Sequence, residues 1–96
     1  MAAPDEKVAA LVYVSGRVQG VGYRFFTERL AAELSVNGWS RNLPDGRVEL
    51  EIEAGREAAL RFIEGLKTGP RMARVSGVSV AWRPFEGRHK GFSIKF

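Results

Sequence analysis

The segment VSGRVQGVGYRFF at residues 14–26 joins two different hydrophobic patterns through a loop rich in glycine. Residues 8–15 alternate in a way that indicates a β-strand, and both faces of this strand are mostly apolar, as in the centre of a sheet. Apolar residues after the loop recur at helical spacing over residues 23–34. The segment therefore predicts a central strand, a loop at residues 16–22 and an amphipathic helix.

The rest of the chain alternates between strand-like and helix-like patterns. Strands are predicted at residues 38–43, 47–54, 73–82 and 92–96, and a second helix at residues 56–67. The LPDG sequence after the second strand predicts a hairpin turn. The order β-α-β-β-α-β, followed by a short final strand, predicts an α+β fold. This is the ferredoxin-like split β-α-β sandwich, in which two helices cover one face of an antiparallel sheet. We expect residues 1–96 to form a single domain, with residues 1–7 as a flexible N-terminal tail.

The helix at residues 23–34 is expected to bury a stripe formed by Phe26, Leu30 and Leu34, which follow one another at intervals of four, with Ala31 beside them. The sequence VNG at residues 36–38 is expected to close this helix. Asn37 or Gly38 is expected to take the left-handed conformation that ends it.

Two features of the later strands predict local geometry. Val75 has the wrong parity for the apolar face of its strand, so Gly77 is predicted to mark a β-bulge. Glu49, Glu51 and Glu53 alternate along one strand, on the face away from its apolar residues. We interpret this row as a solvated face rather than as a magnesium site.

The composition excludes several classes of site. The 96 residues contain no cysteine, which rules out disulfides, thiolate metal sites and a cysteine nucleophile, and which fits a reducing compartment. Fifteen basic and eleven acidic residues give a net charge of +4, so we expect an anionic partner. The N-terminus does not resemble a signal peptide, and no segment approaches the ~18 apolar residues of a membrane span. The default expectation is a cytoplasmic monomer without a membrane partner.

The glycine-rich loop is suited to binding an anion. Glycines before a helix allow successive N–H groups to point into one concavity, at the positive end of the helix dipole. The same dipole disfavours a cation in the first helical turn, so Arg24 at that place indicates an anion between them. The alternative is an ordinary glycine-rich turn beside an exposed arginine. The loop lacks the Gly-Lys-Ser/Thr ending of a P-loop and the third glycine of a dinucleotide fingerprint.

Two long motifs give the chain a resemblance to a known family. GRVQGVGYRFF at residues 16–26, followed by GWSRNLPDGRVE at residues 38–49, resembles the two signature segments of the acylphosphatases. The resemblance covers essentially the whole chain, and it implies the same sandwich fold that the hydrophobic pattern predicts.

The resemblance also implies a role for individual residues. It implies a phosphate-binding loop whose main-chain N–H groups surround the phosphoryl group, formed by Arg17, Val18, Gln19, Gly20, Val21 and Gly22. Arg24 matches the arginine that binds the phosphoryl oxygens, and Asn42 matches the asparagine that holds the attacking water. Ser40 departs from the family, which has a small apolar residue there; a buried hydroxyl at this position needs a hydrogen-bond partner.

These residues fit hydrolysis of an acyl phosphate to a carboxylate and inorganic phosphate, without a metal or other cofactor. A carboxylate leaving group, whose acid has a pKa of about 4–5, needs neither protonation nor a metal ion. Catalysis would then consist of positioning and charge stabilisation during direct attack by water.

The alternative function is a basic ferredoxin-like module that binds RNA or another anion without catalysis. Such a module needs exposed aromatic residues on the open face of the sheet, and Tyr13 is the candidate on the first strand. No segment matches the RNP1 pattern, so we expect no nucleic-acid partner.

Overall fold

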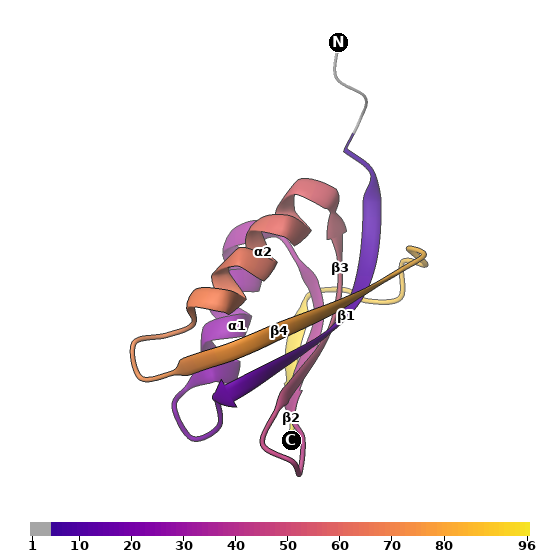
Figure 1. The fold of residues 1–96 in the computed structure, drawn as a ribbon. Coiled ribbons are helices and arrows are strands. Elements are labelled where there is room, and N and C mark those ends of the chain that lie inside the picture. Colours follow the sequence, from indigo (N-terminus) through magenta and orange to yellow (C-terminus); the bar gives the residue numbers. More distant parts are fainter. Residues whose placement is uncertain (1–4) are drawn as a thin grey trace.

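The computed structural model describes residues 5–96, and it places both helices on one face of a single β-sheet (Figure 1). The elements in chain order are β1 (Lys7–Arg17), α1 (Tyr23–Leu34), β2 (Asn37–Asn42), β3 (Val48–Gly55), α2 (Arg56–Thr68), β4 (Arg74–Arg83) and β5 (Phe92–Lys95). The strand order β4-β1-β3-β2-β5 confirms the ferredoxin-like α+β prediction. None of the helices within residues 5–96 is long and apolar enough to cross a membrane.

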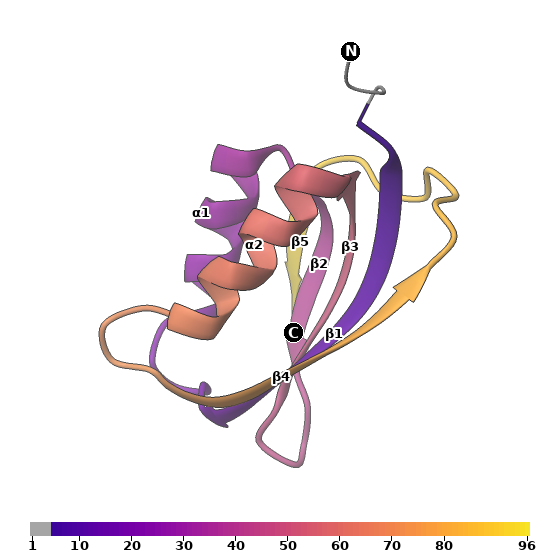
Figure 2. The same ribbon diagram turned by 45° about the horizontal axis from the view of Figure 1, so that its top comes forward.

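The sheet is mixed, and this differs from the fully antiparallel sheet that the sequence predicted. β1 pairs antiparallel with β3 and β4, and β2 pairs antiparallel with β3, but β5 pairs parallel with β2. The segment between β4 and β5 crosses the sheet from one edge to the other (Figure 2). Because it crosses at one end only, β5 runs opposite to β4 and therefore in the direction of β2.

The core lies between the sheet and the two helices. Alternate residues of the two central strands are fully buried, namely Val12, Val14, Val48, Leu50 and Ile52. α2 contributes Ala59, Phe62 and Leu66 at the same level of burial. Full burial of one such aliphatic or aromatic side chain contributes about 1.5–3 kcal/mol, so this layer holds the helices on the sheet.

The buried stripe of α1 differs from the predicted one. The buried residues of this helix are Tyr23, Thr27 and Ala31. The predicted set of Phe26, Leu30 and Leu34 is only partly buried. Leu30 of the predicted stripe faces α2 instead: a Cβ added to Gly65 of α2 would lie 2.5 Å from Leu30 Cδ2. Gly65 thus allows the two helices to approach closely at Leu30.

The end of α1 also corrects the sequence prediction. Ser35 takes the left-handed conformation, with φ of 59°, while Asn37 and Gly38 already belong to β2. The predicted bulge is confirmed, because Ser15 pairs with Gly77 whereas the next residue of β1 pairs with Val75. The extra residue restores Val75 to the core-facing side of β4.

Residues 5–7, the part of the predicted tail that the structure describes, make contacts with the rest of the chain. Lys7 begins β1, Glu6 O accepts a hydrogen bond from Arg56 N, and Asp5 Oδ1 accepts one from Glu57 N at 3.3 Å. The main chain before β1 is therefore tied to the start of α2. Residues 1–4 lie outside the described part of the chain.

The row of glutamates is not a solvated face. Glu49 and Glu53 are 7% and 2% exposed, because side chains and the crossing segment at residues 84–91 cover the sheet on this side. Glu53 accepts hydrogen bonds from the main-chain N–H groups of Glu86 (3.2 Å) and His89 (3.0 Å). Glu51 accepts from Trp39 Nε1 and lies 2.8 Å from His89 Nε2. The carboxylates thus fix the crossing segment to the sheet.

These contacts predict a loss of stability in acid. Burial raises the pKa of Glu53, but main-chain N–H donors, His89 first among them, outweigh it and hold the pKa below its ordinary value. The stabilisation is therefore complete above the unfolded-state pKa of about 4.3 and is lost as the pH falls through the lower folded-state pKa. We expect Glu53→Gln to unfold at a lower temperature than the parent at pH 7, with a smaller further decrease at pH 3. Glu64→Gln, at an exposed position of α2, is the matched control. Equal pH dependence of Glu53→Gln and the parent in thermal unfolding would contradict this account.

Candidate active site

The sheet topology brings the glycine loop and Asn42 to the same edge. β1 and β2 both run antiparallel to β3, so they run parallel to each other and end at the same side. Val48 of β3 pairs with Val14 on one side and with Asn42 on the other. The loop that follows β1 and the turn that follows β2 therefore leave the sheet together, at the lower end in Figure 1.

The loop is shorter than predicted and is anchored from inside. β1 continues through Arg17, which pairs with Arg74 of β4, so the irregular segment is residues 18–22. Val18 is 1% exposed and belongs to the core, and Val21 packs against the same core. Two side chains pointing inward leave the main chain of the loop at the surface.

The N–H groups of the loop and of the start of α1 are open. Gly20 and Gly22 have φ of 71° and 77°, a conformation that other residues rarely adopt. None of the N–H groups of residues 19–22 donates to a main-chain carbonyl within the described chain. α1 has no side-chain cap and no acidic residue in its first turn, whereas Asp5 and Glu57 supply carboxylates at the start of α2. The first helix thus presents several unpaired donors at its positive end.

Gln19 fastens the loop to the β2–β3 turn. Its side-chain Nε2 donates to Leu43 O at 2.8 Å and to Arg47 O at 3.0 Å. The same two carbonyls also accept from main-chain N–H groups of the turn, those of Gly46 and Leu43. The side-chain amide of Gln19 therefore sets the distance between the loop and the end of β2.

This bridge predicts an effect on both stability and anion binding. We expect Gln19→Leu to lower the free energy of unfolding by about 0.5–1.5 kcal/mol, because the two carbonyls keep their other partners. We also expect weaker inhibition of catalysis by inorganic phosphate. Gln19→Glu should lower the free energy of unfolding and weaken phosphate inhibition more than Gln19→Leu does, since a carboxylate would face two carbonyl oxygens. Denaturant titration and phosphate inhibition would check this, and a Gln19→Leu protein equal to the parent in both would contradict the bridging role.

Arg24 reaches the same edge from the first turn of α1. Its Nη1 donates to Lys95 O at 3.0 Å, and its guanidinium lies 4.7 Å from the centre of the Phe96 ring. Lys95 pairs with Arg41 of β2, the residue before Asn42. The guanidinium therefore lies at the ends of β5 and β2, and one of its five N–H donors is paired with an acceptor among residues 5–96.

Asn42 ends β2 with an unusual side chain. Its Oδ1 is the one buried side-chain nitrogen or oxygen without a hydrogen-bond partner among residues 5–96. An unpaired buried acceptor costs about 1–3 kcal/mol, so such groups are rare in folded proteins. This position is thus unfavourable for stability, and it leaves the oxygen with an unused acceptor site.

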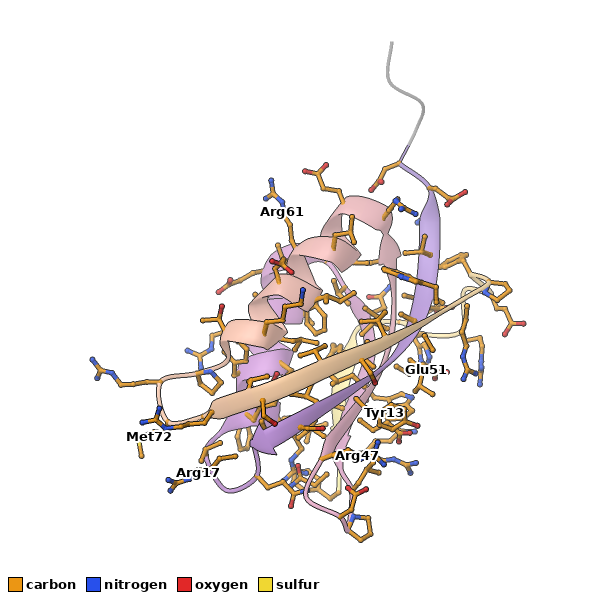
Figure 3. The ribbon with its side chains drawn as sticks, in the orientation of Figure 1. Tyr13, Arg17, Arg47, Glu51, Arg61 and Met72 are labelled. Atoms are coloured by element: carbon orange, nitrogen blue, oxygen red, sulfur yellow. The ribbon has the colours of Figure 1, made fainter. Side chains whose placement is uncertain are left out.

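The end of the molecule that carries these groups is basic. Figure 3 shows Arg17 and Arg47 at the same end as the loop. Asp45 in the turn is paired with Arg47, whose main-chain N–H is the largest of several causes that lower the pKa of this carboxyl. The acidic residue nearest to the loop in the β2–β3 turn is therefore neutralised by an arginine.

Sequence reasoning missed three contacts of this site. It did not foresee the bridge from Gln19, the contact between Arg24 and Lys95, or the partner of Ser40, which is Thr27. Arg24 and Lys95 are 71 positions apart, and no local pattern reports such a contact. Ser40 alone gave a signal, because a hydroxyl at a core-facing position requires a partner.

The sheet face opposite the helices offers little support for RNA binding. Tyr13 donates to Glu49, and Arg47 covers its ring at 4.6 Å. Trp39, on the same face, is covered by Lys95 at 4.4 Å. Aromatic rings occupied by side chains of the same molecule are poor stacking platforms for bases.

Comparison with known proteins finds sequences and a solved structure that are similar to this chain. The family model described as Acylphosphatase matches residues 10–94. A protein named acylphosphatase from Thermus thermophilus is 52% identical over 81 residues, which cover 84% of this chain and 91% of that one. Another from Roseiflexus sp. is 46% identical over 85 residues, covering 88% and 91%. The crystal structure of acylphosphatase from Bacillus subtilis has a TM-score of 0.90 at 36% identity, covering 93% of this chain and 99% of that one.

These similarities cover both signature segments and the strands and helices between them. They do not favour the alternative of a non-catalytic binding module. The chain belongs to the acylphosphatase family.

Proposed function

We propose that this protein hydrolyses acyl phosphates, breaking the carboxyl-phosphate bond to release a carboxylate and inorganic phosphate. The observation that carries the proposal is the convergence of three groups at one sheet edge. These are the open N–H groups of residues 19–22, the guanidinium of Arg24 and the unpaired Oδ1 of Asn42. The names of the relatives point to the same substrate class.

In this proposal the phosphoryl group binds at the start of α1. The N–H groups of the loop and of the first helical turn donate to its oxygens, and Arg24 adds a planar pair of donors. Negative charge on the phosphoryl oxygens offsets the repulsion between Arg24 and the helix dipole. Arg17, at the end of β1, adds positive charge near the loop.

Asn42 would act on the nucleophile. Its Oδ1 accepts a hydrogen bond from a water molecule and orients one lone pair of that water toward phosphorus. Water attacks in line with the bond to the acyl oxygen, a new P–O bond forms, and the electron pair of the broken bond leaves on the carboxylate. An amide is too weak a base to take the proton, so a phosphate oxygen of the substrate takes it.

The leaving group determines the substrate class. A carboxylate is stable without a proton at neutral pH, because its acid has a pKa of about 4–5. An alkyl phosphate would expel an alkoxide, which requires an acid or a metal ion at the leaving oxygen. We therefore propose mixed carboxylic-phosphoric anhydrides as substrates and alkyl phosphates as poor substrates.

The first test is hydrolysis of benzoyl phosphate by the purified protein, with EDTA present and with the spontaneous rate subtracted. Turnover in EDTA supports the proposal, whereas its absence, or turnover only after a divalent cation is added, contradicts it. An alkyl phosphate ester serves as the control substrate. Cytoplasmic location and a monomeric state remain predictions from the sequence, and gel filtration would test the second.

A further inference from the structure

Two buried hydroxyl groups connect the elements that carry Arg24 and Asn42. Thr27 of α1 and Ser40 of β2 are both completely buried, and their side-chain oxygens lie 3.1 Å apart. Thr27 Oγ1 also lies 2.7 Å from the main-chain oxygen of Arg24. Packing of the core does not require hydroxyl groups at these two positions, since small apolar side chains would fill the same space.

The number of hydroxyl protons determines which group donates in each of these two hydrogen bonds. Each hydroxyl has one proton, and the carbonyl of Arg24 can only accept. The proton of Thr27 therefore goes to Arg24 O, and the proton of Ser40 goes to Thr27 Oγ1. The result is a directed chain from Ser40 through Thr27 to the main chain of Arg24.

The chain ends close to both proposed catalytic side chains. Thr27 lies one helical turn after Arg24, and Ser40 lies two residues before Asn42 on the same face of β2. No element of the chain lies between the two hydroxyls, so any shift of α1 along β2 stretches their hydrogen bond. This hydrogen bond therefore fixes the position of the first turn of α1 relative to the end of β2 that holds Asn42.

We propose that Ser40 and Thr27 are positioning residues for acyl phosphate hydrolysis, which hold the Arg24 turn of α1 in register with Asn42. The inference rests on the proposed function of Arg24 and Asn42. Neither hydroxyl touches the substrate. Their effect is to keep the phosphoryl group and the oriented water in line, and small misplacements of reacting groups lower the rate of such reactions steeply.

Stability alone does not account for the pair. Replacing both members of a buried hydrogen bond by apolar groups of the same shape is close to neutral or stabilising. The variant with both Thr27→Val and Ser40→Ala should therefore unfold at the same temperature as the parent or a higher one. A positioning role predicts that this stable variant is nevertheless a poorer catalyst.

The test compares the parent with Thr27→Val, Ser40→Ala, the double variant and Thr27→Ser, each assayed with benzoyl phosphate and for inhibition by inorganic phosphate. We expect kcat to fall about tenfold in Thr27→Val and in Ser40→Ala, with the phosphate inhibition constant changed less than about twofold. Ser40→Ala should add little to Thr27→Val, because either change breaks the same chain. Thr27→Ser keeps the hydroxyl and should recover most of the kcat that Thr27→Val loses.

Two results would overturn the inference. One is a double variant with the kcat of the parent, and the other is an equal loss of kcat in Thr27→Ser and Thr27→Val, which would mean that packing of the methyl group matters and the hydroxyl does not. Thermal unfolding of each variant shows which ones are folded, and Thr27→Ser decides the question where Thr27→Val does not fold. A parent protein without turnover would overturn the proposed function itself, so the two failures are distinguishable.

Discussion

Arg24→Ala is expected to lower kcat/KM for benzoyl phosphate by about 10³-fold, the upper range for removal of a donor that stabilises transition-state charge. The reason is that, in the proposed function, the guanidinium supplies paired donors to the phosphoryl oxygens as charge redistributes among them. Four of its five N–H donors have no acceptor among the residues that the structure describes. Inhibition by inorganic phosphate should weaken in parallel, since the product has the same oxygens.

The stability of Arg24→Ala separates this loss from unfolding. The substitution removes one hydrogen bond, to Lys95 O, which is worth about 0.5–1.5 kcal/mol. It also removes a cation from the positive end of α1, where the repulsion costs about 0.3–1 kcal/mol. The two effects nearly cancel, so we expect the free energy of unfolding to change by less than about 1 kcal/mol.

Arg29→Ala is the matched control, since Arg29 is an exposed arginine on the same helix. It should keep the activity of the parent. Arg24→Lys keeps the charge and loses the planar pair of donors, so it should remain closer to Arg24→Ala than to the parent. Activity of Arg24→Ala within tenfold of the parent, in a folded protein, would remove Arg24 from the phosphate site.

The fold was predictable where local patterns and sheet parity agree. Val48, Leu50 and Ile52 face the core as their alternation requires, and Gly77 marks a bulge because Val75 could reach the core in no other way. The prediction that Glu49, Glu51 and Glu53 form a solvated face was wrong, because strand alternation specifies two faces but not what covers the second one. The covering segment at residues 84–91 carries no periodic signal, so burial of Glu53 became visible only in three dimensions.

The candidate site was predictable in its parts and not in its assembly. The loop and Arg24 follow from helix electrostatics and the resemblance, whereas their distance from Asn42 depends on strand order across the sheet. The side chain of Gln19 illustrates the limit. Its two acceptors are main-chain oxygens of Leu43 and Arg47, and every residue type has such an oxygen, so no residue identity signals the bridge.

Asn42→Ala is expected to change activity and stability in opposite directions. We expect kcat for benzoyl phosphate to fall about 10²–10³-fold, because the substitution removes the acceptor that we propose to orient the attacking water. The free energy of unfolding should stay the same or rise, since an unpaired buried acceptor costs about 1–3 kcal/mol and the substitution removes it. Activity assays and denaturant titration of the same sample would measure both.

Asn37→Ala makes the same chemical change at the other end of β2, and it should give the reverse result. Asn37 Oδ1 accepts a hydrogen bond from Gly91 N at 3.1 Å, so its loss should lower stability and leave kcat unchanged. A pair of variants with opposite signs cannot be explained by general damage to β2. If Asn42→Ala were less stable than Asn37→Ala and had the same kcat as Asn37→Ala, Asn42 would be a structural residue of the turn. The expected result instead means that the unpaired oxygen of Asn42 is kept at a cost in stability because catalysis needs it.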